Sequence, residues 1–154
     1  MSAEQLAAEV AAVMLAADQA TRALGMQLES VQPGSASVRM QVRADMLNGH
    51  GTCHGGFIFA LADSAFAFAC NSDNQRTVAA GCQIDFLRPA GAGEWLRAVA
   101  SARRIGARQG VFDVEIRDAQ ERLVALFRGR SSRIGGTLVQ PRQAAPQPGA
   151  QHDA

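Results

Sequence analysis

The residues best suited to chemistry lie in one short segment, between Asn48 and Asp63. Its sequence, NGHGTCHGGFIFALAD, places two glycines at the start of an apolar stretch and one carboxylate within it. If this stretch is a helix, the backbone N–H groups of its first turn lack intrahelical partners and lie at the positive end of the helix dipole. Gly55 and Gly56 would let a ligand approach those groups closely, which predicts a site for a developing oxyanion. The alternative is that the glycines only form a tight joint between loop and helix.

Asp63 is the second candidate, because it lies within the apolar stretch FIFALADSAFAFA. Burial of an unpaired carboxylate is costly, so this side chain needs either a local partner or a catalytic role. Ser64 is adjacent in sequence but points elsewhere on a helix. The functional interpretation is a general base or a nucleophile. The structural interpretation is a capping contact across an interface.

The spacing of Gly55 and Asp63 has a geometric consequence. Eight residues on one helix span about 12 Å along its axis, whereas a base and an oxyanion donor must both reach one acyl carbon within about 3–4 Å. One helix therefore cannot supply both groups to the same carbonyl. Two antiparallel copies related by a two-fold axis can. If both residues are catalytic, the spacing therefore predicts a homodimer in which Gly55 of one subunit faces Asp63 of the other.

The loop before the glycines contains weaker candidates. Asn48 would orient an acyl group or a water molecule, or it only forms a turn beside Gly49. His54 would cap the helix, hold the loop or act on a substrate. Cys53 is a poor candidate for a nucleophile, because His54 is the one neighbouring base.

The elements that must position these residues are predicted from periodicity. Residues 55–71 are too many for an ordinary strand and apolar on all sides, which predicts a buried helix; the short length and the central acid argue against a membrane span. Residues 3–20 have helical spacing, and the segments on either side of Pro33-Gly34 alternate like a hairpin. Further strands are expected near residues 76–87, 94–104, 110–118 and 122–133.

An antiparallel sheet wrapped around one apolar helix satisfies this order of elements, with a second subunit covering the rest of the helix. The predicted class is therefore α+β. The predicted organisation is an N-terminal helix in residues 1–22, one domain in residues 23–136, and a disordered tail in residues 137–154 that is rich in Pro, Gln and Ala.

Composition limits the possible functions. The 154 residues are 47% apolar and carry a net charge of +1, which predicts a globular domain without the field that would favour nucleic acid or a membrane as partner. All fifteen basic residues are arginine, so any anion site must use guanidinium or backbone N–H groups. Three widely spaced cysteines without a CxxC pair fit free thiols in a reducing cytosol and argue against a structural metal site. The N-terminal segment has neither the basic region nor the unbroken apolar run of a signal peptide.

Three segments resemble the PaaI-type phenylacetate-degradation thioesterases of the hotdog superfamily: NGHGTCHGGFIFALADSAFAFACNS, GCQIDFLRPA and ALFRGRSSRIGGTL. The resemblance extends over residues 20–137. Its specific features are HGG at a helix start, an acid eight residues after the first glycine, an Asn seven residues before it, and a following DFLRP strand. The resemblance implies a hotdog fold, homodimers with a continuous sheet that pair into homotetramers, and hydrolysis of acyl-CoA thioesters in the cytoplasm without a cofactor or metal.

The resemblance also implies roles for individual residues. Gly55 would donate its backbone N–H to the thioester oxygen, and Asn48 would polarise or position the thioester. Asp63 of the opposing subunit would activate water, or attack the carbonyl to form a mixed anhydride. His54 would have a supporting role. Some relatives hold the water with a Ser or Thr on the next strand, whereas residues 78–81, VAAG, have no hydroxyl.

Substrate contacts are expected from residues that can hold the CoA phosphates or the acyl group. Strand alternation would place two of the arginines, Arg128 and Arg130, on one face, although either could equally be a solvated surface charge. The predicted contacts are Gly56, Arg88, Pro89, Arg128, Arg130 and Ser131.

Phenylacetyl-CoA or a ring-hydroxylated aryl-acyl-CoA is the expected substrate, and a short- or medium-chain aliphatic acyl-CoA is the alternative. A non-catalytic hotdog module that binds acyl-CoA would need an attached regulatory domain, for which this chain has no room, and would not need Asp63. A hotdog hydratase or dehydratase would need a His together with an acid in the helix region, and residues 55–71 contain no His.

Overall fold

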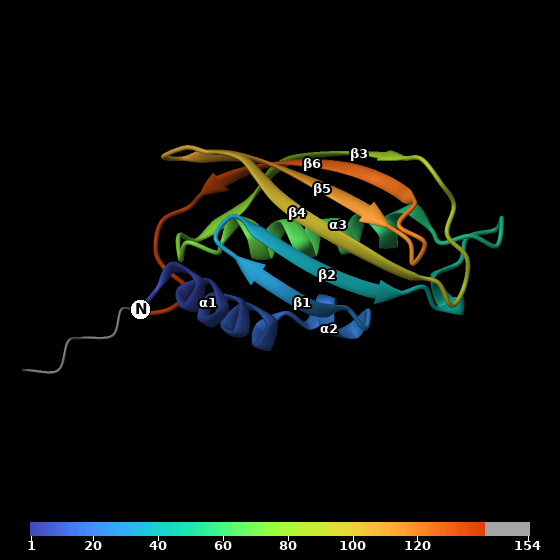
Figure 1. Ribbon diagram of the computed structural model, residues 1–154, viewed down its shortest axis with the longest axis horizontal. Coiled ribbons are helices and arrows are strands. Elements are labelled where there is room, and N and C mark those ends of the chain that lie inside the picture. Colours follow the sequence, from blue (N-terminus) through green and yellow to red (C-terminus); the bar gives the residue numbers. More distant parts are fainter. Residues whose placement is uncertain (141–154) are drawn as a thin grey trace, which may run out of the picture.

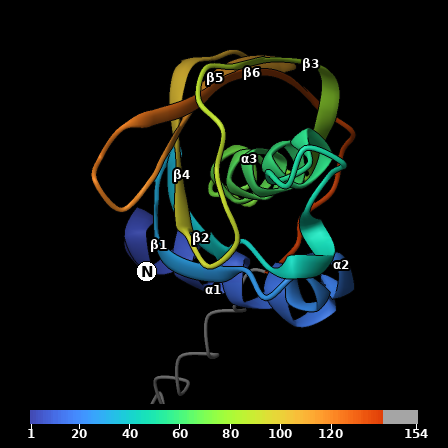
Figure 2. The same cartoon turned by 90° about the vertical axis from the view of Figure 1, so that its right-hand side faces the viewer.

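One antiparallel sheet of six strands curves around a long helix in the computed structural model, which describes residues 1–140 (Figures 1 and 2). The helices are α1 (Ala3–Ala17), α2 (Gln19–Ala23) and α3 (Gly55–Cys70), with a short 3-10 turn at Ala44–Met46. The strands are β1 (Gln27–Gln32), β2 (Ser35–Gln41), β3 (Thr77–Phe86), β4 (Trp95–Ile105), β5 (Gln109–Arg117) and β6 (Leu123–Arg133). Their order in the sheet is β1-β2-β4-β5-β6-β3. The predicted buried helix and the six predicted strands are confirmed.

Helix α3 forms the centre of the core because its apolar residues occupy nearly its whole circumference. It packs mainly on β2, β4 and β5. The ring of Phe66 lies 5.5 Å from that of Phe112 in β5 and 5.8 Å from that of Phe127 in β6, so the helix is fixed against both of these strands. Within residues 1–140, no helix combines the length and apolar character needed to cross a bilayer. The buried residues of α3 are Ile58, Leu61, Ala62, Ala65, Phe66, Phe68, Ala69 and Cys70.

One side of α3 is not covered by the sheet. Ala60, Asp63 and Ala67 recur at helical spacing along this side and are only half-buried. Beside them runs β3, which is an edge strand with Val78 and Phe86 exposed by 45% and 53%. We call this surface, formed by β3 and the uncovered side of α3, the open edge. An apolar edge strand of this length normally requires a partner.

The N-terminal segment contains two helices, so the prediction of one continuous helix to residue 20 is wrong. Asp18 has extended backbone angles that end α1, and its side chain caps α2 by accepting the backbone N–H of Thr21 at 2.9 Å. The buried hydroxyl of Thr21 lies 2.6 Å from the Asp18 carboxylate and 2.9 Å from the hydroxyl of Ser64. This chain of three polar groups fixes α2 to α3 one residue away from Asp63.

Thr21→Val is expected to lower the free energy of unfolding by about 1–3 kcal/mol, because the partners of the lost hydroxyl remain in place without it. Urea unfolding followed by circular dichroism measures this value. Thr137→Val is the matched control, since no hydrogen bond of that side chain exists among the described residues, and its effect should stay within about 0.5 kcal/mol. Equal effects of the two substitutions would contradict the assigned contact.

The domain extends further than residue 136, at which the tail was expected to begin. The side chain of Asn74 accepts the backbone N–H groups of Leu138 and Val139, both at 2.9 Å, and donates to the Val139 carbonyl at 2.9 Å. These bonds tie residues 137–140 to the segment after α3, which corrects the predicted boundary. The rest of the expected tail, residues 141–154, lies outside the described residues.

Candidate active site

The first turn of α3 leaves one backbone donor free. The Nδ1 atom of His54 accepts the backbone N–H of Gly56 at 2.9 Å, and the His54 carbonyl accepts that of Phe57 at 3.0 Å. No described residue accepts the backbone N–H of Gly55. Of the two glycines, Gly55 is therefore the one whose donor is available to a ligand, and His54 is the N-cap of the helix.

Gly55 is also a position at which no side chain fits. A Cβ atom added there would lie 2.8 Å from the Cζ atom of Phe86, whose ring covers this end of α3. The sequence did not single out Phe86. Phe86 lies in the DFLRP motif and is the last residue of β3, which was the one available signal. Only the curvature of the sheet brings this end of β3 to the start of α3.

A pocket of about 450 Å³ opens beside Gly55, between the start of α3 and the end of β3. It brings together four of the predicted site residues from three separate segments, whereas the neighbouring Gly56 is exposed and bonded to His54. A pocket of this size, apolar on one side and with polar groups near the free N–H, suits a small acyl group. The residues that line it are Asn48, Thr52, Cys53, Gly55, Ile58, Phe86, Leu87, Arg88 and Pro89.

Asn48 folds the loop that closes this pocket. Its Oδ1 atom accepts the backbone N–H groups of His50 at 2.9 Å and Thr52 at 3.2 Å, and its Nδ2 atom lies 3.1 Å from the Thr52 hydroxyl. Asn48 therefore forms the turn that the alternative interpretation predicted. A carboxamide has two N–H donors, so one remains for a ligand in the pocket.

Asp63 lies on the uncovered side of α3 without a hydrogen bond or ion pair to any described residue. Burial raises the pKa of this carboxyl above its ordinary value. The thiols of Cys70 and Cys82 have raised pKa values, mainly from their own burial, and the nearby Asp63 charge adds to both. Asp63 therefore faces β3, while the adjacent Ser64 is bonded to Thr21.

The two main candidates are separated within one chain. Gly55 and Asp63 are eight residues apart on the confirmed helix, about 12 Å along its axis, and Asp63 does not line the pocket beside Gly55. The hydroxyl of Thr77, at the start of β3, donates to the Gln75 carbonyl at 2.7 Å. Residues 78–81 supply no hydroxyl, so this part of β3 offers Asp63 no Ser or Thr partner.

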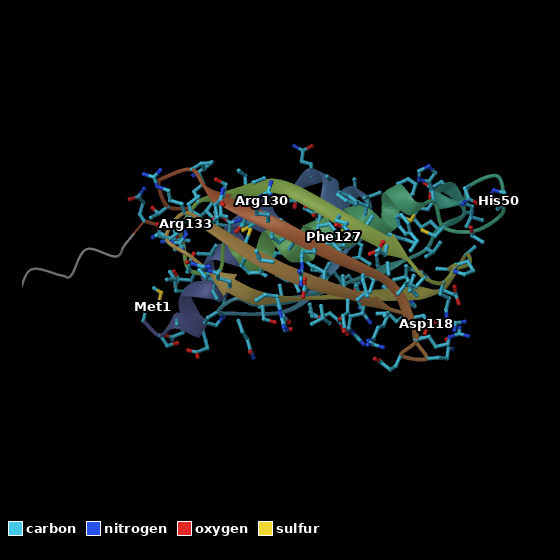
Figure 3. All side chains as sticks on the ribbon, turned by 90° about the horizontal axis from the view of Figure 1, so that it is seen from above. Met1, His50, Asp118, Phe127, Arg130 and Arg133 are labelled. Carbon is cyan, nitrogen blue, oxygen red and sulfur yellow. The ribbon has the colours of Figure 1, made fainter. Side chains whose placement is uncertain are left out.

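The remaining predicted contacts lie elsewhere on the sheet. Arg128 and Arg130 both project from the outer face of β6, as alternation predicts, whereas Ser131 is buried on the inner face. Both oxygens of Asp113 hold the guanidinium of Arg128, at 2.7 and 3.0 Å, so this group is not free. Figure 3 shows Arg130 far from His50, whose loop closes the Gly55 pocket. Within one chain, Arg128, Arg130 and Ser131 therefore do not line the pocket beside Gly55.

These features define a class of protein: the chain belongs to the thioesterase superfamily, whose family model matches residues 50–125. The acyl-coenzyme A thioesterase PaaI of Escherichia coli (strain K12) is 53% identical over 122 residues, which are 79% of this chain and 87% of that protein. The solved structure of the E. coli PaaI protein from the phenylacetic acid degradation operon has a TM-score of 0.87 at 51% identity, over 88% of this chain and 99% of that one. The TT0310 protein of Thermus thermophilus has a TM-score of 0.74 at 44% identity, over 76% and 98%. The hotdog fold and the resemblance seen in the sequence are thereby confirmed.

Proposed function

We propose that the protein is an acyl-CoA thioesterase that hydrolyses phenylacetyl-CoA, or a ring-hydroxylated relative, to the free acid and CoA. The observation that carries this proposal is the pairing, on one helix, of a free backbone N–H at Gly55 with a carboxylate at Asp63 that has no partner among the described residues. An oxyanion donor and a base are the two groups that thioester hydrolysis requires. The 53% identity to an acyl-coenzyme A thioesterase supports CoA as the thiol.

The catalytic unit in this proposal is a two-fold dimer formed through the open edge. Antiparallel pairing of β3 with its copy would extend the sheet and cover the exposed side chains of Val78 and Phe86. The small residues Ala60 and Ala67 on either side of Asp63 would let the two α3 helices approach closely. Gly55 of one subunit then lies beside Asp63 of the other, and two such dimers would form the tetramer.

The reaction uses these groups in turn. The thioester oxygen accepts the Gly55 N–H of one subunit, and Asp63 of the other takes a proton from water as its oxygen bonds to the carbonyl carbon. The C–S bond then breaks, and the proton on Asp63 passes to the departing CoA thiolate. In the alternative route Asp63 attacks the carbonyl carbon, and the C–S bond breaks as the CoA thiolate leaves and takes up a proton. Water then opens the resulting anhydride, which releases the free acid and restores the Asp63 carboxylate. The remaining N–H donor of Asn48 would position the thioester, and Arg88 and Pro89 would border the acyl group.

A thiol-release assay across a panel of acyl-CoAs tests the proposal. We expect kcat/KM for phenylacetyl-CoA to exceed that for acetyl-CoA by at least about tenfold, because filling an apolar pocket contributes that much per added group. Preference for hexanoyl-CoA would instead identify an aliphatic thioesterase. Binding of every acyl-CoA without release of thiol would identify a non-catalytic module and contradict the proposed thioesterase activity.

We place this activity in the cytoplasm. All three cysteines, Cys53, Cys70 and Cys82, are free thiols in the part of the chain that the structure describes, and persistent free thiols fit a reducing compartment. The proposed reaction needs only the side chain and backbone groups named above.

A further inference from the structure

One residue with an ionised side chain, Arg88, lines the pocket beside Gly55. No Asp or Glu is among the residues that line this pocket. Within residues 1–140, the guanidinium of Arg88 forms neither an ion pair nor a hydrogen bond, and only the backbone of this residue is bonded. The charge of Arg88 is therefore unmatched in the pocket that it lines.

The other polar groups of the pocket already have partners or a role. The Oδ1 atom of Asn48 accepts two backbone N–H groups, and its Nδ2 atom lies 3.1 Å from the Thr52 hydroxyl. The thiol of Cys53 donates to a backbone carbonyl at 3.6 Å. In the proposed function, the Gly55 N–H and the remaining Asn48 donor hold the thioester. Arg88 is thus the one polar group of the pocket whose partner is still to be named.

The backbone of Arg88 is fixed on both sides. The backbone N–H groups of Leu87 and Arg88 both donate to one carbonyl in β6, that of Val124, at 2.8 and 3.2 Å. Two residues further on, the Ala90 carbonyl accepts the backbone N–H of Cys53 at 2.7 Å. The segment is therefore tied to the sheet and to the loop before α3. The arginine stays beside the pocket, and its long side chain can adjust to a ligand.

The end of the acyl group decides what this cation contributes. An acyl group that fills the pocket excludes water, so a hydrocarbon end would leave the guanidinium less solvated and without a partner, which costs free energy. A carboxylate at the same place would form paired, charge-assisted hydrogen bonds with it. The positive end of the α3 dipole adds to the potential at this end of the helix. The pocket therefore favours an acyl group that ends in a negative charge.

We propose that acyl-CoA thioesters whose acyl group ends in a carboxylate are a second class of substrate, with Arg88 holding that carboxylate. The inference rests on the proposed function, because the same groups perform the hydrolysis. Water adds to the thioester carbonyl, the C–S bond breaks, and the products are a dicarboxylic acid and CoA. Asp63 of the partner subunit acts at the carbonyl, so several bonds must separate the two carboxylates to limit their repulsion.

The test compares substrates that differ only in the charge at the end of the acyl group. Adipyl-CoA is assayed against adipamoyl-CoA, and 4-carboxyphenylacetyl-CoA against 4-carbamoylphenylacetyl-CoA, because a carboxamide has nearly the shape of a carboxylate but no charge. Rates are corrected for hydrolysis without protein. For at least one of these pairs, kcat/KM for the carboxylate should exceed that for the amide by about tenfold or more, the effect of one charge-assisted contact.

Substitution of Arg88 should remove this preference. The ratio of the two kcat/KM values should fall to about one in Arg88→Gln and stay above one in Arg88→Lys, which keeps the charge. A ratio measured within one variant cancels any general loss of activity. Arg43→Gln is the matched control, because Arg43 precedes the same loop but pairs with Asp45 at 3.0 Å and does not line the pocket. It should keep the native ratio.

Calorimetric titration with two thioethers makes the test independent of turnover. S-(5-carboxypentyl)-CoA should bind about tenfold more tightly than S-(5-carbamoylpentyl)-CoA, and Arg88→Gln should abolish the difference. If this preference holds but no thioester is hydrolysed, the proposed function fails and recognition of the carboxylate by Arg88 stands. If phenylacetyl-CoA is hydrolysed but both ratios are near one in the native protein, the proposed function stands and the inference fails. A preference that persists in Arg88→Gln also overturns it, because another group then holds the carboxylate.

Discussion

Asp63→Asn is expected to reduce kcat for phenylacetyl-CoA by about 10²–10⁴-fold, the range associated with loss of a general base. Asparagine has nearly the same shape as aspartate but can neither take a proton from water nor attack a carbonyl. KM should change little, because in the proposed mechanism the carboxylate acts at the reacting carbon and not on the CoA portion. Steady-state thiol release, with the oligomeric state measured by light scattering, gives both values.

Asp45→Asn is the control for this substitution, because Asp45 is exposed and, among residues 1–140, pairs only with Arg43. It should retain native kcat. Near-native turnover in Asp63→Asn would instead show that the half-buried carboxylate has a structural role. Dissociation of the oligomer in this variant would show that the Asp63 carboxylate holds the subunits together.

The same carboxyl links stability to pH. Burial raises its folded pKa above the ordinary aspartate value of about 3.9, so between those two values the folded protein holds a proton that the unfolded chain has lost. Stability from this group is therefore greatest at low pH and is lost as pH rises through the folded pKa. Asp63→Asn should melt at least as high as the native protein at neutral pH, with the difference vanishing toward about pH 4. The acid limb of kcat/KM should also lie above the ordinary aspartate range.

Mixing two inactive variants is expected to restore activity, because each site of the proposed dimer takes one group from each subunit. Gly55→Ala should lower kcat by about 10²–10³-fold, since its Cβ would lie 2.8 Å from Phe86 and the ring would be driven toward the oxyanion position. In a mixed dimer with Asp63→Asn, one site carries both changes and the other carries neither. Random reassembly of equal amounts should give about a quarter of native activity, because half of the dimers are mixed and each has one intact site.

Gly49→Ala is the matched control, because it lies in the loop that precedes α3 and an added Cβ there meets no atom of the described residues within 4 Å. It should be fully active alone and should not restore activity beyond simple addition when mixed with Asp63→Asn. If the mixture of Gly55→Ala and Asp63→Asn remains inactive after exchange is demonstrated, the site lies within one subunit and the proposed geometry is wrong.

The central helix could be predicted because its signal is local. A stretch that is apolar on all sides and longer than a strand must be a buried helix, and an acid within it is conspicuous from sequence alone. The strands likewise matched their predicted ranges closely, since Pro, Gly and the polar turn Asp118-Ala119-Gln120 separate them. The break at Asp18 was missed because it depends on a side chain bonding to Thr21 rather than on a helix-breaking residue.

The surroundings of the site could not be predicted, because they depend on strand pairing. Phe86 covers Gly55 only because β3 is the edge strand of the sheet and ends beside the start of α3. The ion pair of Arg128 could not be predicted for the same reason, since its partner Asp113 lies on the neighbouring strand.

The open edge has a consequence for the newly made chain. The proposed dimer would cover this edge, whereas a single copy presents the unpaired backbone groups of β3 together with exposed Val78, Phe86 and Leu87. Mass action then makes folding depend on concentration, because dimerisation removes folded monomers from the equilibrium with unfolded chains. A cell that makes little of this protein would have not merely fewer enzyme molecules but a larger fraction of them exposed to proteolysis and aggregation, so activity would fall faster than abundance.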